Sequence, residues 1–173
     1  MANFITDRTQ SHVDRLKALR AKGYKNLSAS EKSEWEGDAQ KGAYNYTDLN
    51  RVESAVAEIA KTLGLDLRTK TNWTKWDIPT QSEMDRYLGN VRKIREALGG
   101  GSGIVGGILG SFTLGKDVLG TSKGDTSILP GLPDTMAGLT YEGANNIEKC
   151  LSMSMNISDS APRSGEVFCG EVN

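Results

Sequence analysis

The sequence is poor in the residues from which most catalytic and metal sites are built. Its 173 residues include one histidine, His12, and two cysteines, Cys150 and Cys169. Metal sites usually need several Cys or His ligands, and a histidine-based triad would have to use His12. Two cysteines 19 residues apart provide no disulfide framework, so we expect both to be thiols. The composition predicts no enzyme, and therefore no catalytic residues, no cofactor and no metal.

Long hydrophobic runs and a surplus of one charge are also missing. No stretch contains the 18 or more apolar residues of a membrane helix, and the first ten residues lack the apolar core of a secretory signal. The formal net charge is −1, whereas dedicated nucleic-acid binders carry a dense basic surface. We expect synthesis in the cytoplasm, no nucleic-acid binding and no stable membrane insertion.

The strongest pattern in the chain predicts a helix over residues 48–63. Thr47 is its expected N-cap and Gly64 its expected end. Apolar residues recur at steps of three and four, as on one face of a helix. These residues are Leu49, Val52, Val56, Ile59 and Leu63.

Similar signals predict three more helices, over residues 9–22, 28–39 and 81–98. Capping-box patterns, in which Ser or Thr precedes Glu by three residues, occur at Ser28 and Thr80. Residues 65–68 alternate in hydropathy and also allow a short strand. We therefore predict a mainly α fold, with a small bundle of about four helices over residues 1–98.

Composition changes sharply at Gly99, where a glycine-rich extended arm or linker is predicted over residues 99–133. Ten glycines lie between residues 99 and 124, and glycine loses much entropy on ordering. The arm nevertheless carries apolar side chains that we expect to bind a partner. They are Ile104, Val105, Ile108, Leu109 and Phe112.

Residues 134–173 are predicted to form a short helix at about 141–152 and a β-prone C-terminal segment. An isolated helix of that length is marginal in water, so it must pack on the bundle or on a partner. Val167, Phe168 and Val172 favour an edge strand that could pair with a partner's sheet.

The starts of two predicted helices resemble each other at a spacing of 95 residues. Residues 46–53 (YTDLNRVE) and 141–148 (YEGANNIE) match at Tyr, Asn, an aliphatic residue and Glu. Two explanations of this match stay open. Four matches in eight positions can arise by chance, or the two segments share a way of starting a helix in which Asn and Glu bond nearby backbone groups.

Two sets of side chains allow both a structural and a binding interpretation. Trp35, Trp73 and Trp76 either pack between helices or form a sugar-binding platform, for which Trp73 and Trp76 are the best candidates. Four basic residues either form a solvated helix face or contact nucleic acid or an acidic partner. They are Arg86, Arg92, Lys93 and Arg95.

Several segments together resemble a known family. They are FITDRTQ (4–10), EKSEW (31–35), GAYNYTDLNRVE (42–53), TKTNWTKWDIPTQSEMDRYLGNV (69–91), LTYEGANNIE (139–148) and SGEVFCGEV (164–172). In these segments the chain resembles small tail-associated proteins encoded in phage and prophage tail modules of Gram-positive bacteria, near baseplate and tail-fibre genes. The resemblance covers residues 4–98 and 129–172. Residues 152–162 are more polar than the helical continuation expected in such proteins.

This resemblance implies a non-enzymatic structural component of a phage tail or tail-like particle. It would act by protein docking at the distal tail, the baseplate or the fibre attachment region. Its partners would be other tail, baseplate or fibre proteins, and it would form a homo-oligomer in a symmetric assembly. Its location would be the virion or particle, after synthesis in the bacterial host cytoplasm. The alternatives are a receptor- or carbohydrate-binding module at the tail tip and a membrane-active segment at residues 103–115.

Overall fold

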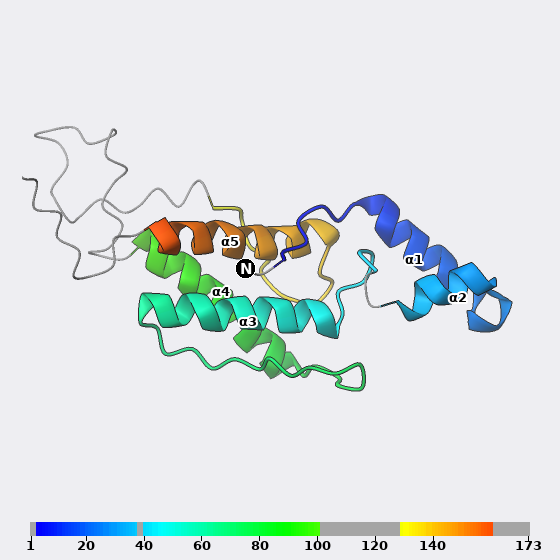
Figure 1. Ribbon diagram of the computed structural model, residues 1–173, viewed down its shortest axis with the longest axis horizontal. Helices are drawn as coiled ribbons and strands as arrows, with labels where there is room; N and C mark the ends of the chain where they lie inside the picture. The colour runs from blue at the N-terminus through cyan, green and yellow to red at the C-terminus, as the bar shows by residue number, and fades with distance from the viewer. Residues whose placement is uncertain (1–2, 38–39, 101–128, 161–173) are drawn as a thin grey trace, which may run out of the picture.

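The protein is mainly α-helical, as predicted (Figure 1). The computed structural model describes residues 3–37, 40–100 and 129–160. Within these ranges there are five α-helices, one 3-10 turn and no strand, so the strand allowed at residues 65–68 does not form. In chain order the elements are α1 (Gln10–Lys22), η1 (Tyr24–Asn26), α2 (Ala29–Glu36), α3 (Tyr46–Leu63), α4 (Gln81–Gly100) and α5 (Tyr141–Ser160).

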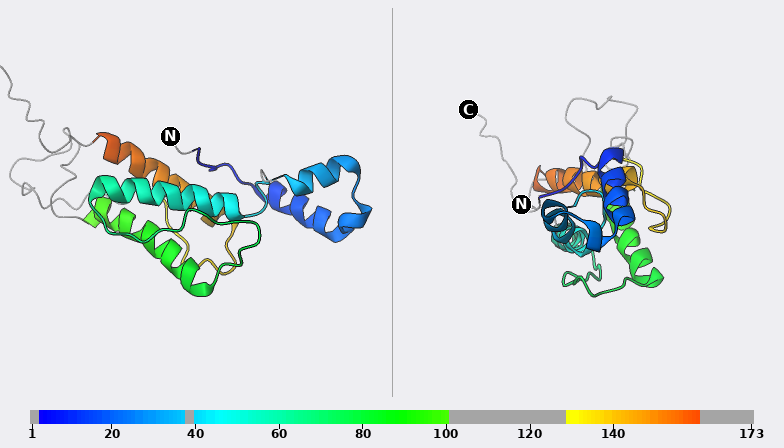
Figure 2. Two further views of the ribbon diagram at one scale, coloured as in Figure 1. Left: turned by 60° about the horizontal axis from the view of Figure 1, so that its bottom comes forward. Right: turned by 90° about the vertical axis from the view of Figure 1, so that its right-hand side faces the viewer.

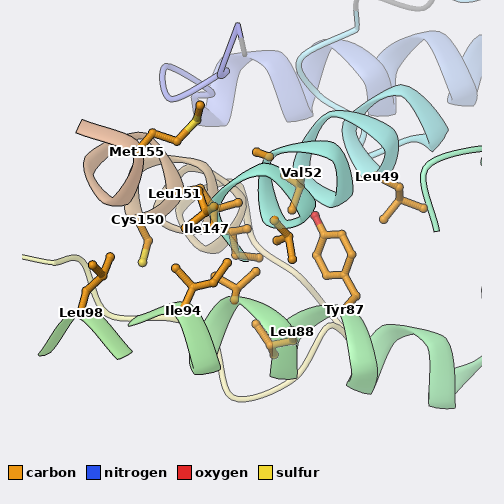
Figure 3. Packing of buried hydrophobic residues seen from close by; sticks show 14 of the residues in the cluster. Leu49, Val52, Tyr87, Leu88, Ile94, Leu98, Ile147, Cys150, Leu151 and Met155 are labelled. Carbon is orange, nitrogen blue, oxygen red and sulfur yellow. The ribbon is translucent and has the colours of Figure 1, made fainter. Parts of the chain in front are cut away.

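Helices α3, α4 and α5 form the hydrophobic core. Figure 3 shows their apolar side chains pointing toward one another between the three helices. Burial of one such side chain contributes about 1.5–3 kcal/mol relative to exposure. Among the most completely buried members are Val52 and Ile59 on α3, Val91 and Ile94 on α4, and Ile147 and Leu151 on α5.

The helices group differently from the bundle predicted within residues 1–98. Helices α1 and α2, with η1 between them, form a hairpin that projects from one end of the core (Figures 1 and 2). Only Leu19 is buried in α1, and no residue of α2 is buried. These two helices offer too little apolar surface for a place in the core, and α5 takes it instead.

Helix α5 is longer than the sequence pattern suggested. The pattern predicts an end near residue 152, but the helix continues to Ser160. Its last described turns keep apolar contacts with the core through Met155 and Ile157. The polar Ser154 fits inside the core because its hydroxyl donates to the carbonyl oxygen of Cys150 at 2.8 Å. The helix was predicted to pack on the bundle or on a partner, and it packs on α3 and α4 in the core.

The helix ends combine confirmed signals with one correction. Both predicted capping boxes, at Ser28 and at Thr80, are formed. Helix α3, however, is capped by Asn45 rather than by Thr47. The Asn45 side chain accepts a bond from the Thr47 N–H at 2.8 Å, and Asp48 accepts one from the Asn45 N–H at 2.9 Å. The Asn–Asp pair therefore moves the start of the helix two residues toward the N-terminus.

Two other helix ends differ slightly from prediction. Helix α2 ends at Glu36 instead of near residue 39, while α4 runs two residues past Leu98 to Gly100.

Cys150 is a free thiol within the core, and its burial raises its pKa. Cys169 lies outside the described residues.

Candidate functional site

The residues predicted to bind a partner cannot be located in the fold. All eight lie outside the described residues, as do the glycine-rich stretch 101–128 and the C-terminal segment 161–173. They are Ile104, Val105, Ile108, Leu109, Phe112, Val167, Phe168 and Val172.

The repeated pattern on α3 holds a distant extended segment. Asn50 and Trp73 exchange two hydrogen bonds: the Asn50 amide donates to the Trp73 carbonyl at 2.8 Å, and the Trp73 N–H donates to Asn50 Oδ1 at 2.7 Å. Glu53 follows Asn50 by three residues, and Lys70 precedes Trp73 by three. The Lys70 N–H donates to Glu53 Oε2 at 3.1 Å. Asn50 and Glu53 thus fix residues 70–73 along the helix.

The matching pattern on α5 holds the N-terminal segment in the same way. Asn145 exchanges two bonds with the backbone of Arg8, at 2.8 and 3.0 Å, and Glu148 Oε2 accepts the Ile5 N–H at 2.7 Å. The sequence match therefore reflects two equivalent arrangements. In each, which we call a clamp, a helix Asn and the Glu three residues later bond the backbone of a remote segment. Asn and Glu do bond backbone groups, as predicted, but these groups lie on remote segments and not near the helix start.

The two clamped segments also share a sequence pattern, which the comparison of residues 46–53 with 141–148 did not include. Residues 6–9 and 71–74 both have the form Thr, Asp or Asn, any residue, Thr. In each clamp the third residue of this pattern, Arg8 or Trp73, is the one bonded by the asparagine. Comparing the two Asn-x-x-Glu sites with the rest of the sequence could have found this signal.

A buried ion network completes the clamp on α5. Arg8 Nη2 donates to Asp48 Oδ1 at 2.8 Å and to Glu148 Oε1 at 2.7 Å. Arg51 also bonds both carboxylates, with its Nε 2.8 Å from Glu148 Oε2. Two cations face two anions, so the network is neutral, and it ties the N-terminal segment to both α3 and α5. Burial alone would lower the pKa of Arg51, but its bonds to Glu148 and Asp48 raise it overall.

These carboxylates are poorly placed for catalysis. Arg8, Asp48 and Glu148 are all buried, and the two carboxylates bond Arg8, Arg51 and backbone N–H groups. Among the described residues, no group of three or more His, Cys, Asp or Glu side chains could hold a metal ion.

The basic residues of α4 divide between internal contacts and solvent. Arg86 pairs with the buried Glu53 at 2.6 Å, and Arg92 Nη2 donates to the carbonyls of Pro133 and Asp134 at 2.8 Å each. Lys93 is exposed and Arg95 half-buried. Two of the four therefore anchor other parts of the chain, so the cluster is neither a simple solvated face nor a continuous basic surface.

The three tryptophans have different environments, and the proposed pair is split. Trp73 is 3% exposed and belongs to the core, whereas Trp76 is 82% exposed and Trp35 is 37% exposed. Trp73 is buried because its backbone is clamped by Asn50 against α3. A platform made of Trp73 and Trp76 is therefore wrong, and Trp76 alone stays available to a ligand or partner.

Trp76 lies on an ordered apolar loop, residues 74–79. Ile78, two residues further on, is 89% exposed. Asp77 holds the turn: it accepts the Thr74 N–H at 2.6 Å and the Thr74 hydroxyl at 2.9 Å. These bonds, first that of the Thr74 N–H, lower the pKa of Asp77 below its usual 3.8. The loop thus presents two large apolar side chains to solvent in a fixed turn.

A second feature is a pocket of about 420 Å³ at the hairpin, which we call the hairpin pocket. Leu16 and Leu19 of α1 provide apolar walls, and the ion pair of Arg15 with Glu34, 2.6 Å apart, lies beside them. Gly42 closes one side so tightly that a Cβ there would lie 2.2 Å from the His12 carbonyl oxygen. His12, which also lines the pocket, is half-buried.

No described helix is both long enough and apolar enough to cross a bilayer. In comparisons with known proteins, no family model matches the chain, and neither a curated protein nor a solved structure does.

Proposed function

We propose that this protein is a non-enzymatic structural component of a phage tail or tail-like particle, which acts by docking at the distal tail, the baseplate or the fibre attachment region. The observation that carries the proposal is the loop of residues 74–79. Apolar side chains this exposed on a fixed turn are typical of protein contacts. The buried charged groups, in contrast, are used to hold the chain together.

The resemblance of residues 4–98 and 129–172 to tail-associated proteins supports the setting of this proposal. The partners are other tail, baseplate or fibre proteins, and copies of the chain assemble symmetrically in the particle. The arm over residues 99–133 and the C-terminal segment remain proposed contacts, through the eight apolar residues named above. The protein is made in the bacterial host cytoplasm and is then incorporated into the particle.

The test is the protein content of purified particles. Cryo-electron microscopy and mass spectrometry of particles from the source bacterium are expected to find the chain at the distal tail. In a deletion strain, a wild-type copy restores incorporation, whereas the double variant Trp76→Ser, Ile78→Ser reduces it at least tenfold. Trp35→Ser is the matched control and leaves incorporation unchanged. Absence of the wild-type chain from intact particles would contradict the proposal.

A receptor- or carbohydrate-binding module is the second candidate. Trp76 belongs to the loop that follows Lys70, and Lys70 borders a groove of about 470 Å³ lined mainly by polar side chains. An exposed aromatic ring beside hydrogen-bonding groups is a common way to bind sugars. The exposed Ile78 fits this use less well than it fits a protein contact. Quenching or a shift of tryptophan fluorescence by cell-wall polysaccharide, lost in Trp76→Ser, would favour this candidate.

A further inference from the structure

Three sequence patterns occur twice in the chain, and they occur in the same order. The first is the pattern of the clamped segment, and the third is the helix pattern that contains the clamp Asn and Glu. Between them lies Thr-Gln-Ser, two variable residues and Asp-Arg, at residues 9–15 and 80–86. This order divides the described chain into a first unit, residues 5–63, and a second unit, residues 70–160.

The middle pattern forms the same local structure in both units. In the first unit the Gln10 amide donates to Asp14 Oδ1 at 2.8 Å. In the second unit the Gln81 amide donates to Asp85 Oδ1 at 2.7 Å. The threonine that opens each pattern precedes a helix, and its N–H donates to the side chain three residues later. Because the order of the patterns and their local hydrogen bonds repeat together, the match at Asn and Glu belongs to a larger repeat.

Each unit holds the clamped segment of the other unit. Asn50, on α3 of the first unit, exchanges its two bonds with Trp73 of the second unit. Asn145, on α5 of the second unit, exchanges its two bonds with Arg8 of the first unit. Both segments run in the same direction along their helices, because each clamp Glu bonds the residue three positions before the one bonded by Asn. The exchange is therefore reciprocal.

The buried ion pairs also cross between the units. The clamp glutamate of the first unit, Glu53, pairs with Arg86 of the second unit at 2.6 Å. The clamp glutamate of the second unit, Glu148, pairs with Arg8 and Arg51 of the first unit at 2.7 and 2.8 Å. Both glutamate side chains are at most 1% exposed. Each buried carboxylate thus depends on the other unit for its compensating charge.

The helices of the middle pattern differ between the units. Helix α4 lies in the core, whereas α1 lies outside it (Figure 1). At three positions where α4 has buried apolar residues, the first unit has a cation or glycine. The α4 residues are Leu88, Val91 and Ile94, and their counterparts are Lys17, Arg20 and Gly23. The first unit therefore contributes only α3 to the core helices, and its clamped segment provides a second attachment.

The apolar loop is an addition to the second unit. In the first unit Thr9 both ends the segment pattern and opens the middle pattern, whereas residues 75–79 separate the two patterns in the second unit. Within the described residues, no side chain of 75–79 bonds a clamp Asn or Glu. Trp76 and Ile78 therefore belong to a surface that neither clamp uses.

We propose that the chain is a pair of interlocked repeats, in which each unit is held by the backbone segment and the charges that the other unit supplies. A separated unit would keep a buried carboxylate without its arginine, which is strongly unfavourable. The two units therefore behave as an obligate dimer within one chain. This interlock concerns how the chain is held together and is independent of the docking role.

Cleavage between the units tests the interlock. A protease recognition site is inserted into the full chain after Gly64, the exposed residue that follows α3. After cleavage the purified protein is expected to elute as one species at the size of the uncut chain. Asn50→Ala and Asn145→Ala, in separate proteins, should each raise the dissociation constant of the two fragments at least about tenfold. Asn146→Ala is the matched control and should change it by less than about twofold, because its exposed bond to Gly131 lies within the second unit.

Each variant is first checked by circular dichroism as the uncut chain, so that unfolding is not counted as dissociation. Hydrogen exchange of the cut wild-type protein gives a readout that needs no variant. The bonded amides of both segments should stay protected, and they are those of Ile5, Arg8, Lys70 and Trp73.

Three results would overturn the inference: fragments that separate on cleavage, loss of protection in either segment, or a fragment affinity that does not respond to one of the two asparagines. In the last case core packing alone would hold the halves together. The test uses only the purified chain, so the interlock and the particle assignment can fail independently.

Discussion

Asn145 and Arg8 are 137 residues apart in the chain and exchange two hydrogen bonds. The asparagine amide donates to the Arg8 carbonyl, and the Arg8 N–H donates to the asparagine oxygen. Asn50 and Trp73 form the same pair of bonds over 23 residues. Since Asn145 lies on a core helix, this relationship attaches the N-terminal segment at Arg8 to the core.

Replacing either clamp asparagine with alanine should destabilise the protein by about 1–3 kcal/mol, because each change leaves a partly buried backbone donor and acceptor without a partner. The measurement is urea unfolding of Asn50→Ala and Asn145→Ala, followed by circular dichroism. Asn146→Ala is the matched control, since its bond to the Gly131 carbonyl is exposed. If Asn146→Ala lowers the free energy of unfolding as much as Asn145→Ala does, the clamp bonds do not stabilise the protein more than an exposed hydrogen bond.

Neutralising Glu148 should be more damaging. Glu148→Gln leaves the buried Arg8 with half of its compensating charge, and breaking a buried ion pair commonly costs about 3–5 kcal/mol. We expect a large loss of unfolding free energy in urea at neutral pH. Glu58→Gln removes the same charge from an exposed position of α3 and should change stability by no more than about 0.5 kcal/mol. Similar values for both variants would rule out a stabilising network.

Two glycine-to-alanine changes should have opposite effects. At Gly42 the new Cβ would lie 2.2 Å from the His12 carbonyl oxygen, so the backbone must move. We expect the packing of α1 against Gly42 to be destabilised by about 1–3 kcal/mol. At Gly89, within α4, nothing lies within 4 Å of the new Cβ. Alanine there should stabilise the helix by up to about 1 kcal/mol. Hydrogen exchange of α1 amides and thermal unfolding would measure the two effects. Normal exchange in Gly42→Ala would contradict the first.

The turn that presents Trp76 should be sensitive to acid. The folded pKa of Asp77 is lowered from 3.8, chiefly by the Thr74 N–H, so the carboxylate stabilises the turn fully above the unfolded pKa of 3.8. That contribution is lost as pH falls through the lower folded value. In an NMR titration the Thr74 amide signal should therefore change with a midpoint below 3.8, and Asp77→Asn should abolish the change. A midpoint at or above 3.8 would contradict the hydrogen bonds of the turn.

Sequence patterns predicted the helices well because their causes are local. The steps of three and four in residues 49–63 and the capping boxes at Ser28 and Thr80 each depend on residues within a turn or two. They failed where two local signals compete, as at Asn45 and Thr47, both good N-caps. They also failed at the end of α5, where packing of Met155 and Ile157 on the core outweighs the polarity of neighbouring residues.

The candidate site depended more on the fold. The sequence indicated that Trp73 and Trp76 could act together, and their types and spacing could not distinguish them. The Asn50 clamp decides the difference, because it holds the backbone of Trp73 against α3 while the turn at Asp77 carries Trp76 outward. The predicted partner residues in the arm and at the C-terminus lie outside the described residues.

By itself, the sequence determined the mainly helical class, the approximate positions of the helices and the scarcity of catalytic and metal-binding residues. These properties follow from composition and from interactions between near neighbours. Only the tertiary structure decided that α5 completes the core, that the repeated Asn and Glu residues clamp remote segments, and that Trp76 and Ile78 remain exposed. Those outcomes depend on contacts between residues far apart in the chain, where burial and pairing of charges select one arrangement among many that the local patterns allow.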